Sequence, residues 1–139
     1  MSIPLYFRGY LLNLPDYCGT ISVAIKVKEH VMINFENIPL TVTPEFKGGK
    51  GEFSAHMFSD ELNKIFKGIL SPSSSIGMHI HDTSSEIIFI LSGIGKVYTG
   101  DKVITLNPGD CHYCKKGASH SLVNDGETDL VFYAVVPNQ

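Results

Sequence analysis

Three histidines and one glutamate have the side chains that bind metal ions, and together they would form a metal site if the strands bring them to one point. His79 and His81 are two residues apart on a predicted strand, so both rings point to the same face. Glu86 has the opposite parity and can join them only if the chain reverses, which a predicted turn over residues 82–85 permits. His120 arrives from a later strand. This set of nitrogen and oxygen donors suits a divalent Fe, Mn, Ni, Cu, Co or Zn ion, without selecting among them.

Four protein ligands leave two neighbouring positions open on an octahedral ion. Water, dioxygen or a substrate that chelates through two oxygens can occupy those positions. The ion can then act as a Lewis acid or lower the pKa of bound water.

Short strands separated by turns must position these residues. The predicted strands cover residues 52–58, 65–70, 76–81, 86–91, 96–99, 102–106, 111–114, 120–123 and 130–136. A helix is considered only over residues 60–64. Residues 87–91 are apolar on both faces, so this strand is expected to be covered on both sides, in a sandwich or at a subunit interface. The spacing of strands and turns predicts an all-β protein, an antiparallel sandwich or barrel.

Two segments resemble the paired motifs of the cupin superfamily. The first is His79-Ile80-His81, four residues, Glu86, six residues and Gly93; the second runs from Gly109 through Lys115, Gly117 and His120 to Asn124. Two positions depart from the pattern: Ser73 stands where the first motif has its leading glycine, and Lys115 replaces a proline. The resemblance implies a cupin jelly-roll β-barrel and metal binding by His79, His81, Glu86 and His120.

The motifs place the barrel in residues 32–139 and leave residues 1–31 as an extension, either an edge strand or the product of an upstream start codon. Residues 21–28 alternate and suit a strand. The resemblance implies a metal-dependent enzyme that acts on a small polar molecule, as a dioxygenase, decarboxylase, isomerase or lyase. The alternative is a barrel that binds or senses a small ligand without turnover; a third reading is an accessory protein whose function lies in its dimer surface. A homodimer is expected from the family and from the doubly apolar strand.

Catalytic residues other than metal ligands are not identified by the motifs. Tyr98, Tyr113 and His112 are the candidates, because phenol and imidazole groups near a metal can transfer protons. Each tyrosine can equally be a packed ring with its hydroxyl at the rim. The motifs do not include the remaining histidines, His30, His56 and His112, which are expected at the surface or at strand ends. Of these, His112 is the best candidate to contact a metal ligand or to transfer a proton.

Composition excludes several classes of protein. The chain has 139 residues with 11 Lys+Arg and 14 Asp+Glu, a net charge of −3, which argues against a general nucleic-acid binder. No segment has the length of a membrane helix or the features of a signal peptide. Cys18, Cys111 and Cys114 do not form a disulfide framework, and a reducing cytoplasm is expected. Cys111 and Cys114 have opposite parity on a strand, which disfavours a redox pair.

Overall fold

The structure of the chain is a computed structural model that describes residues 6–7, 10–11 and 30–139. It divides into two units, Met1–Val31 and Met32–Gln139. In the first unit the described elements are two short antiparallel strands, β1 (Tyr6–Phe7) and β2 (Tyr10–Leu11). The strand expected over residues 21–28 and the side chain of Cys18 lie outside the described residues, so those expectations stay predictions.

The second unit consists of strands and two single turns of 3-10 helix. The 3-10 turns are η1 (Phe35–Asn37) and η2 (Phe46–Gly48). The strands are β3 (Thr41–Pro44), β4 (Glu52–Ser59), β5 (Asn63–Leu70), β6 (Ser75–Ile80), β7 (Glu86–Ser92), β8 (Gly95–Thr99), β9 (Lys102–Leu106), β10 (Cys111–Cys114), β11 (Ser119–Val123) and β12 (Leu130–Pro137). Every strand expected after residue 51 is present, with boundaries shifted by one or two residues.

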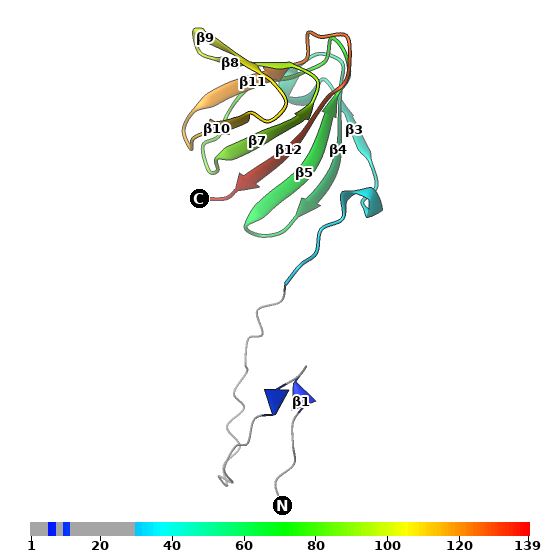
Figure 1. The fold of residues 1–139 in the computed structure, drawn as a ribbon. Coiled ribbons are helices and arrows are strands. Elements are labelled where there is room, and N and C mark those ends of the chain that lie inside the picture. Colours follow the sequence, from blue (N-terminus) through cyan, green and yellow to red (C-terminus); the bar gives the residue numbers. More distant parts are fainter. Residues whose placement is uncertain (1–5, 8–9, 12–29) are drawn as a thin grey trace, which may run out of the picture. The chain divides into compact units, whose positions relative to one another are not determined.

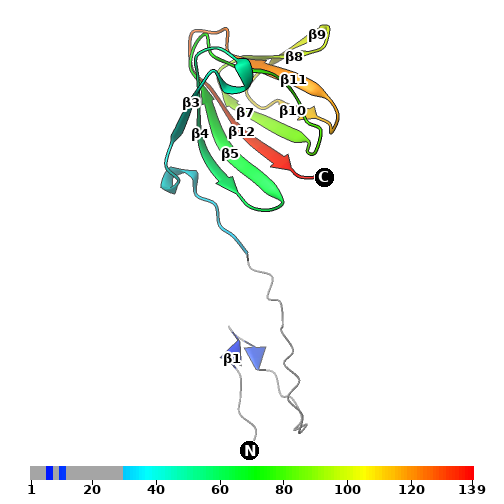
Figure 2. The ribbon, with the colours of Figure 1, turned by 180° about the vertical axis from the view of Figure 1, so that it is seen from behind.

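The strands of this unit form two antiparallel sheets (Figures 1 and 2). The order in the six-stranded sheet is β10-β7-β12-β5-β4-β3, and in the four-stranded sheet it is β6-β11-β8-β9. Strands distant in sequence lie side by side: β12 pairs with both β5 and β7, and β11 pairs with both β6 and β8. This arrangement is a jelly roll and confirms the predicted all-β class.

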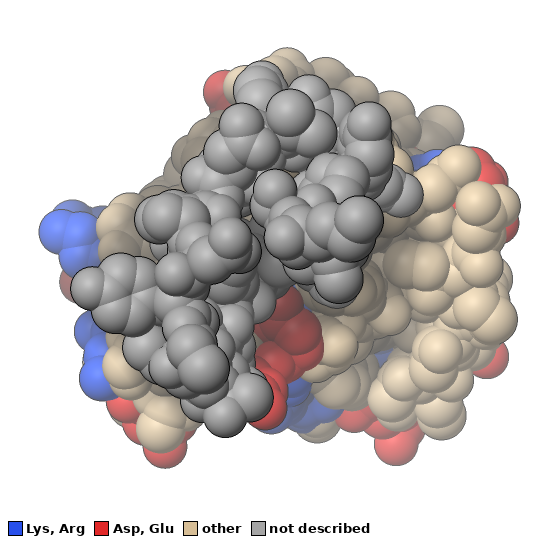
Figure 3. Space-filling view, turned by 90° about the horizontal axis from the view of Figure 1, so that it is seen from below, with Lys and Arg blue, Asp and Glu red and all other residues tan. Residues whose placement is uncertain are grey.

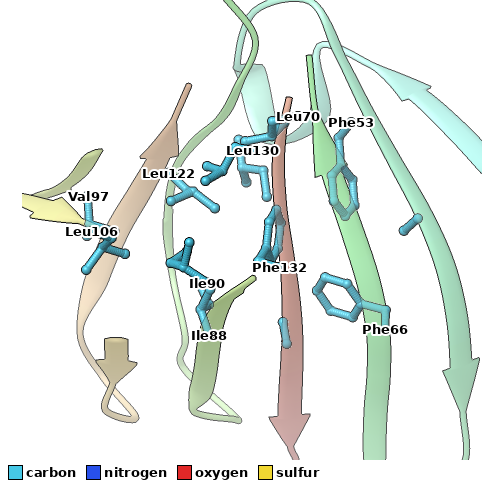
Figure 4. Packing of buried hydrophobic residues seen from close by; sticks show 13 residues of the cluster. Phe53, Phe66, Leu70, Ile88, Ile90, Val97, Leu106, Leu122, Leu130 and Phe132 are labelled. Carbon is cyan, nitrogen blue, oxygen red and sulfur yellow. The ribbon is translucent and has the colours of Figure 1, made fainter. Parts of the chain in front are cut away.

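Apolar side chains from both sheets form the core (Figure 4). On β4 and β5 the inward residues alternate with partly exposed ones, as expected for strands with one buried face. Phe53, Phe66 and Phe132 pack with ring centroids 5.9 to 6.4 Å apart. Gly68 leaves room for this cluster, because a Cβ there would lie 2.5 Å from the Phe132 ring. Burial of each ring contributes about 2 to 3 kcal/mol to folding.

Two local expectations are corrected. Residues 60–64 form no helix: Asp60 Oδ1 accepts hydrogen bonds from the backbone N–H of Leu62 and Asn63, which closes a turn before β5. Among the described residues, β7 is covered on only one side. Its inward Ile88 is 1% exposed, whereas Phe89 on the outer face is 45% exposed, because no described element packs over that face of the six-stranded sheet. The sandwich explanation for its second apolar face is therefore wrong.

No helix among the described residues is long and apolar enough to cross a membrane. Lysine and carboxylate side chains are interspersed around the face shown in Figure 3, and neither sign dominates the part of that face that is described. This distribution agrees with the small net charge of −3.

Candidate metal centre

The four predicted ligands converge between the two sheets. Their donor atoms all lie within 4.8 Å of one another. His81 Nε2 is 3.1 Å from both His79 Nε2 and His120 Nε2. Glu86 Oε2 is 2.8 Å from His120 Nε2 and 3.3 Å from His81 Nε2. Three imidazole nitrogens and one carboxylate oxygen thus surround one point.

Both sheets contribute to this cluster. His79 on β6 and His120 on β11 are direct cross-strand partners in the four-stranded sheet. His81 follows β6 and is held by backbone hydrogen bonds to Gly117 and Ala118. Glu86 is the first residue of β7 in the six-stranded sheet, so the chain crosses between the sheets over residues 82–85, as the predicted reversal required.

Hydrogen bonds fix the orientation of two of the imidazoles. His79 Nδ1 is 2.8 Å from the carbonyl oxygen of Gly77. A carbonyl can only accept, so Nδ1 carries the proton and Nε2 presents its lone pair to the cluster. His81 Nδ1 bonds the hydroxyl of Ser84 at 3.1 Å, which likewise leaves Nε2 toward the cluster. The Nε2 lone pair of His79 is therefore preorganised for a metal ion, and His81 is held with its Nε2 at the same point.

The electrostatics of the cluster also suit a cation. Burial raises the pKa of Glu86, but hydrogen bonds from His120 and His81 outweigh burial and bring that pKa to about 2. Burial lowers the pKa of His79, which favours the neutral imidazole. At neutral pH the cluster thus offers an ionised carboxylate beside a neutral imidazole, the protonation states of metal ligands.

A cavity of about 230 Å³ opens against this cluster. His79, His81 and Glu86 form one wall. Two lysines also line the cavity: Lys47 of η2 and Lys64 of β5. The remaining lining residues are Phe46, Phe53, Met57, Phe66, Ile80, Asp82, Thr83, Ser84 and Val136. The volume is below that of drug-sized pockets and suits a small molecule.

The predicted catalytic candidates occupy different places. Tyr98 on β8 and Tyr113 on β10 are 37% and 51% exposed, and neither lines the cavity. His112 also does not line the cavity, but it is buried with its Nε2 3.1 Å from His120 Nδ1. The expectation of a surface position is wrong for His112, because the alternation of β10 points its side chain inward. For His30, which is exposed, the expectation is confirmed. His56 is half-buried within β4 and bonds the Ile38 carbonyl at 2.6 Å.

The cysteine prediction is confirmed for the two described cysteines. Cys111 is exposed and Cys114 is buried, so they face opposite sides of β10 and are unbonded. Cys114, His112 and His120 also bring their donor atoms within 4.8 Å of one another. Burial raises the pKa of the Cys114 thiol and so opposes the thiolate that a metal requires. Burial has the opposite effect on the imidazole of His112 and lowers its pKa.

Sequence reasoning missed Lys47, Lys64 and Ser84. The run Gly48-Gly49-Lys50-Gly51 follows Lys47 and lies outside every predicted strand. In the structure a Cβ on Gly49 would lie 2.0 Å from the Ser75 carbonyl oxygen, so this loop packs tightly on β6, next to the cavity-lining Lys47. Adjacent glycines that permit close backbone contact were the available signal for this packing.

Comparisons with known proteins agree with the fold. Residues 67–136 match the family model of the cupin domain. An oxalate-binding protein of Thermotoga maritima is 41% identical over 105 residues, which cover 68% of this chain and 87% of the relative. The crystal structure of a predicted oxalate decarboxylase from Thermotoga maritima superposes with a TM-score of 0.73 at 30% identity, covering 78% of this chain and all of that one. The cupin domain of Schizosaccharomyces pombe Cnp3 shares the fold alone, with a TM-score of 0.64 at 11% identity, over 78% of this chain and 74% of that one. The chain therefore belongs to the cupin family.

Proposed function

We propose that this protein binds a divalent transition-metal ion and uses it to hold a small dicarboxylate such as oxalate. The observation that carries the proposal is the convergence of four donor atoms, from His79, His81, Glu86 and His120, at the wall of a small cavity. When bound, the ion supplies a Lewis acid that accepts ligand oxygens. The names of the two Thermotoga maritima relatives, an oxalate-binding protein and a predicted oxalate decarboxylase, support oxalate as the first ligand to test.

The charges around the cavity suit a dianion. The positive charges of Lys47 and Lys64 balance the negative charges of Asp82 and Glu86. A bound divalent ion would therefore give the cavity a net charge of about +2, which a dianion would neutralise. Neither lysine has a carboxylate of the described residues within 4.0 Å, whereas Lys67 and Lys96 do. The ammonium groups at the cavity are thus available to a ligand, and the residues 82–84 add a carboxylate and two hydroxyls for orientation.

Metal binding is tested by elemental analysis of protein purified without added metal and again after incubation with Mn, Fe, Co, Ni, Cu or Zn. We expect about one ion for each wild-type chain and a loss of that ion in a double variant, His79→Ala with His120→Ala. The exposed His30→Ala is the matched control and should retain it. Wild-type protein that takes up none of these metals would overturn the proposal.

Ligand binding is tested by calorimetric titration of metal-loaded and EDTA-treated protein with oxalate, malonate and acetate. We expect oxalate to bind only the loaded protein, and acetate to bind more weakly because it carries a single charge. Equal binding of oxalate to metal-free protein would contradict the role of the ion.

Decarboxylation is the second candidate function. It is favoured by Asp82, a carboxylate other than Glu86 that lines the cavity and can transfer a proton. The reaction would break the C–C bond of oxalate, release CO₂ and place one proton on the remaining carbon to give formate. Incubation with ¹³C-oxalate separates the two candidates: formate and CO₂ indicate an enzyme, and unchanged bound oxalate indicates a binding protein.

A cytoplasmic homodimer completes the proposal. The free cysteines Cys111 and Cys114 suit a reducing compartment. On the outer face of the six-stranded sheet, Phe89 lies between its cross-strand partners Cys111 and Tyr133, and Leu91 continues this exposed apolar row. A second copy of the chain is the occupant we expect for this face. Light scattering that finds only monomers would refute the dimer.

A further inference from the structure

We propose that His112 is a positioning residue that holds His120 in the tautomer and ring orientation needed for metal binding. The inference rests on the proposed function, in which His120 is a ligand, and assigns a task to a buried histidine outside the cluster. His112 Nε2 lies 3.1 Å from His120 Nδ1, and the two rings meet edge to edge, with their centroids 5.3 Å apart and an interplanar angle of 24°.

The two nitrogens of His120 face different groups. Its Nε2 points into the cluster, 2.8 Å from Glu86 Oε2 and 3.1 Å from His81 Nε2. Its Nδ1 points the other way, toward His112 on β10. His79 and His81 have their Nδ1 atoms fixed by a carbonyl and a hydroxyl close in sequence. For His120 that partner is another imidazole, eight residues earlier in the chain.

The direction of this hydrogen bond follows from the ligand role of His120. A neutral imidazole carries one proton, so a His120 that offers its Nε2 lone pair to a metal carries that proton on Nδ1. His120 Nδ1–H then donates, and His112 Nε2 must accept. His112 is therefore neutral, with its own proton on Nδ1. An acceptor in this position orients a metal-bound imidazole and raises its basicity.

The fold holds the acceptor in place. His112 is the cross-strand partner of Ile88 on β7, two residues from the Cys114–Glu86 pair of the same two strands. His112 and Glu86 therefore enter the cluster region from one sheet, while His120 enters it from the other. The hydrogen bond to His112 limits rotation of the His120 ring, which is itself 1% exposed.

Two substitutions separate this role from simple packing. His112→Gln keeps a neutral acceptor on a side chain that reaches as far as the imidazole Nε2, whereas His112→Leu removes the acceptor and keeps the site filled. We expect His112→Leu to weaken Zn²⁺ affinity 10- to 100-fold, and His112→Gln to weaken it by less than about threefold. Tyr113→Phe, on the exposed face of the same strand, is the control and should leave affinity unchanged. Free energies of unfolding are measured in EDTA, so that loss of packing is separated from loss of metal affinity.

The wild-type protein gives a second readout that needs no substitution. Long-range ¹H–¹⁵N correlation spectra of the Zn²⁺-loaded protein report which ring nitrogen of each histidine is protonated. We expect protons on Nδ1 of both His112 and His120. A proton on His112 Nε2, or equal metal affinity in His112→Leu and wild type, would overturn the inference and leave the metal site intact. Wild-type protein that binds no metal would instead refute the proposed function.

Discussion

Replacement of Glu86 by glutamine should change how the metal-free protein responds to acid. The Glu86 carboxylate is buried, and its pKa falls from the ordinary value of 4.5 to about 2 because His120 and His81 donate to it. At about 1.4 kcal/mol for each pKa unit, the ionised carboxylate stabilises the fold by about 3 kcal/mol near neutral pH.

The sign of the pH dependence follows from the direction of the shift. A carboxyl group with a lower pKa in the folded protein contributes its full stability above 4.5, the pKa in the unfolded chain, and loses it as pH falls toward about 2. Between pH 6 and pH 3, the wild-type protein should lose about 2 kcal/mol through Glu86 alone. Glu86→Gln does not titrate and should lack this part of the loss.

The assay is urea denaturation in EDTA at several pH values between 6 and 3. All other carboxyl groups are common to the two proteins, so the difference in free energy of unfolding isolates Glu86. The exposed Glu127→Gln is the matched control and should follow the wild-type curve. If wild type and Glu86→Gln ran parallel over this pH range, the hydrogen bonds would not lower the pKa as argued.

Four further predictions concern the cavity and the fold. Lys47→Ala and Lys64→Ala should each weaken oxalate affinity by up to about fivefold, less at high salt, whereas Lys50→Ala, outside the lining, should have no effect in the same titration. Asn124→Ala should cost about 3 kcal/mol in urea denaturation, because its buried amide bonds Leu70, Thr128 and Gly126. Ser73→Gly should raise the melting temperature, with a gain of up to about 1 kcal/mol, because Ser73 has a φ of 65°. A variant that begins at Met32 should keep the free energy of unfolding of the full chain, since the described core lies within 32–139.

The donor cluster was predictable from strand alternation and from the resemblance to the cupin motifs. Alternation along β6 and into His81 places His79 and His81 on one face, the turn before Glu86 reverses the chain, and the second motif adds His120. The strands after residue 51 were predictable from their apolar alternation and the turns between them, whereas β3, in which no residue is buried, was not predicted. Ser73 shows the limit of motif comparison: it stands where the motif has a glycine and has a φ of 65°, a conformation that glycine adopts more readily than serine.

Features that depend on packing between distant segments were not predictable. Lys47 lies in η2 and Lys64 on β5, and only the assembled fold places them at one cavity. The alternation of β10 placed His112 on the same face as Cys114, but only the packing of the sheets brings that face to His120. The apolar residues on the outer face of β7 led to the prediction that this face is buried, although no described residue of the chain covers it.

The division of the donors between the sheets has a consequence for stability. His79 and His120 belong to the four-stranded sheet and Glu86 to the six-stranded sheet, so an ion held by all of them joins the two layers. Binding that requires both layers in place stabilises the folded state over the unfolded one, by about 2.7 kcal/mol at an ion concentration 100 times the Kd. A site confined to one flexible loop would lack that coupling to the core. Phe53, Phe66 and Phe132 pack together on the six-stranded sheet that also contributes Glu86, and so the metal site depends on the same packing that folds the domain.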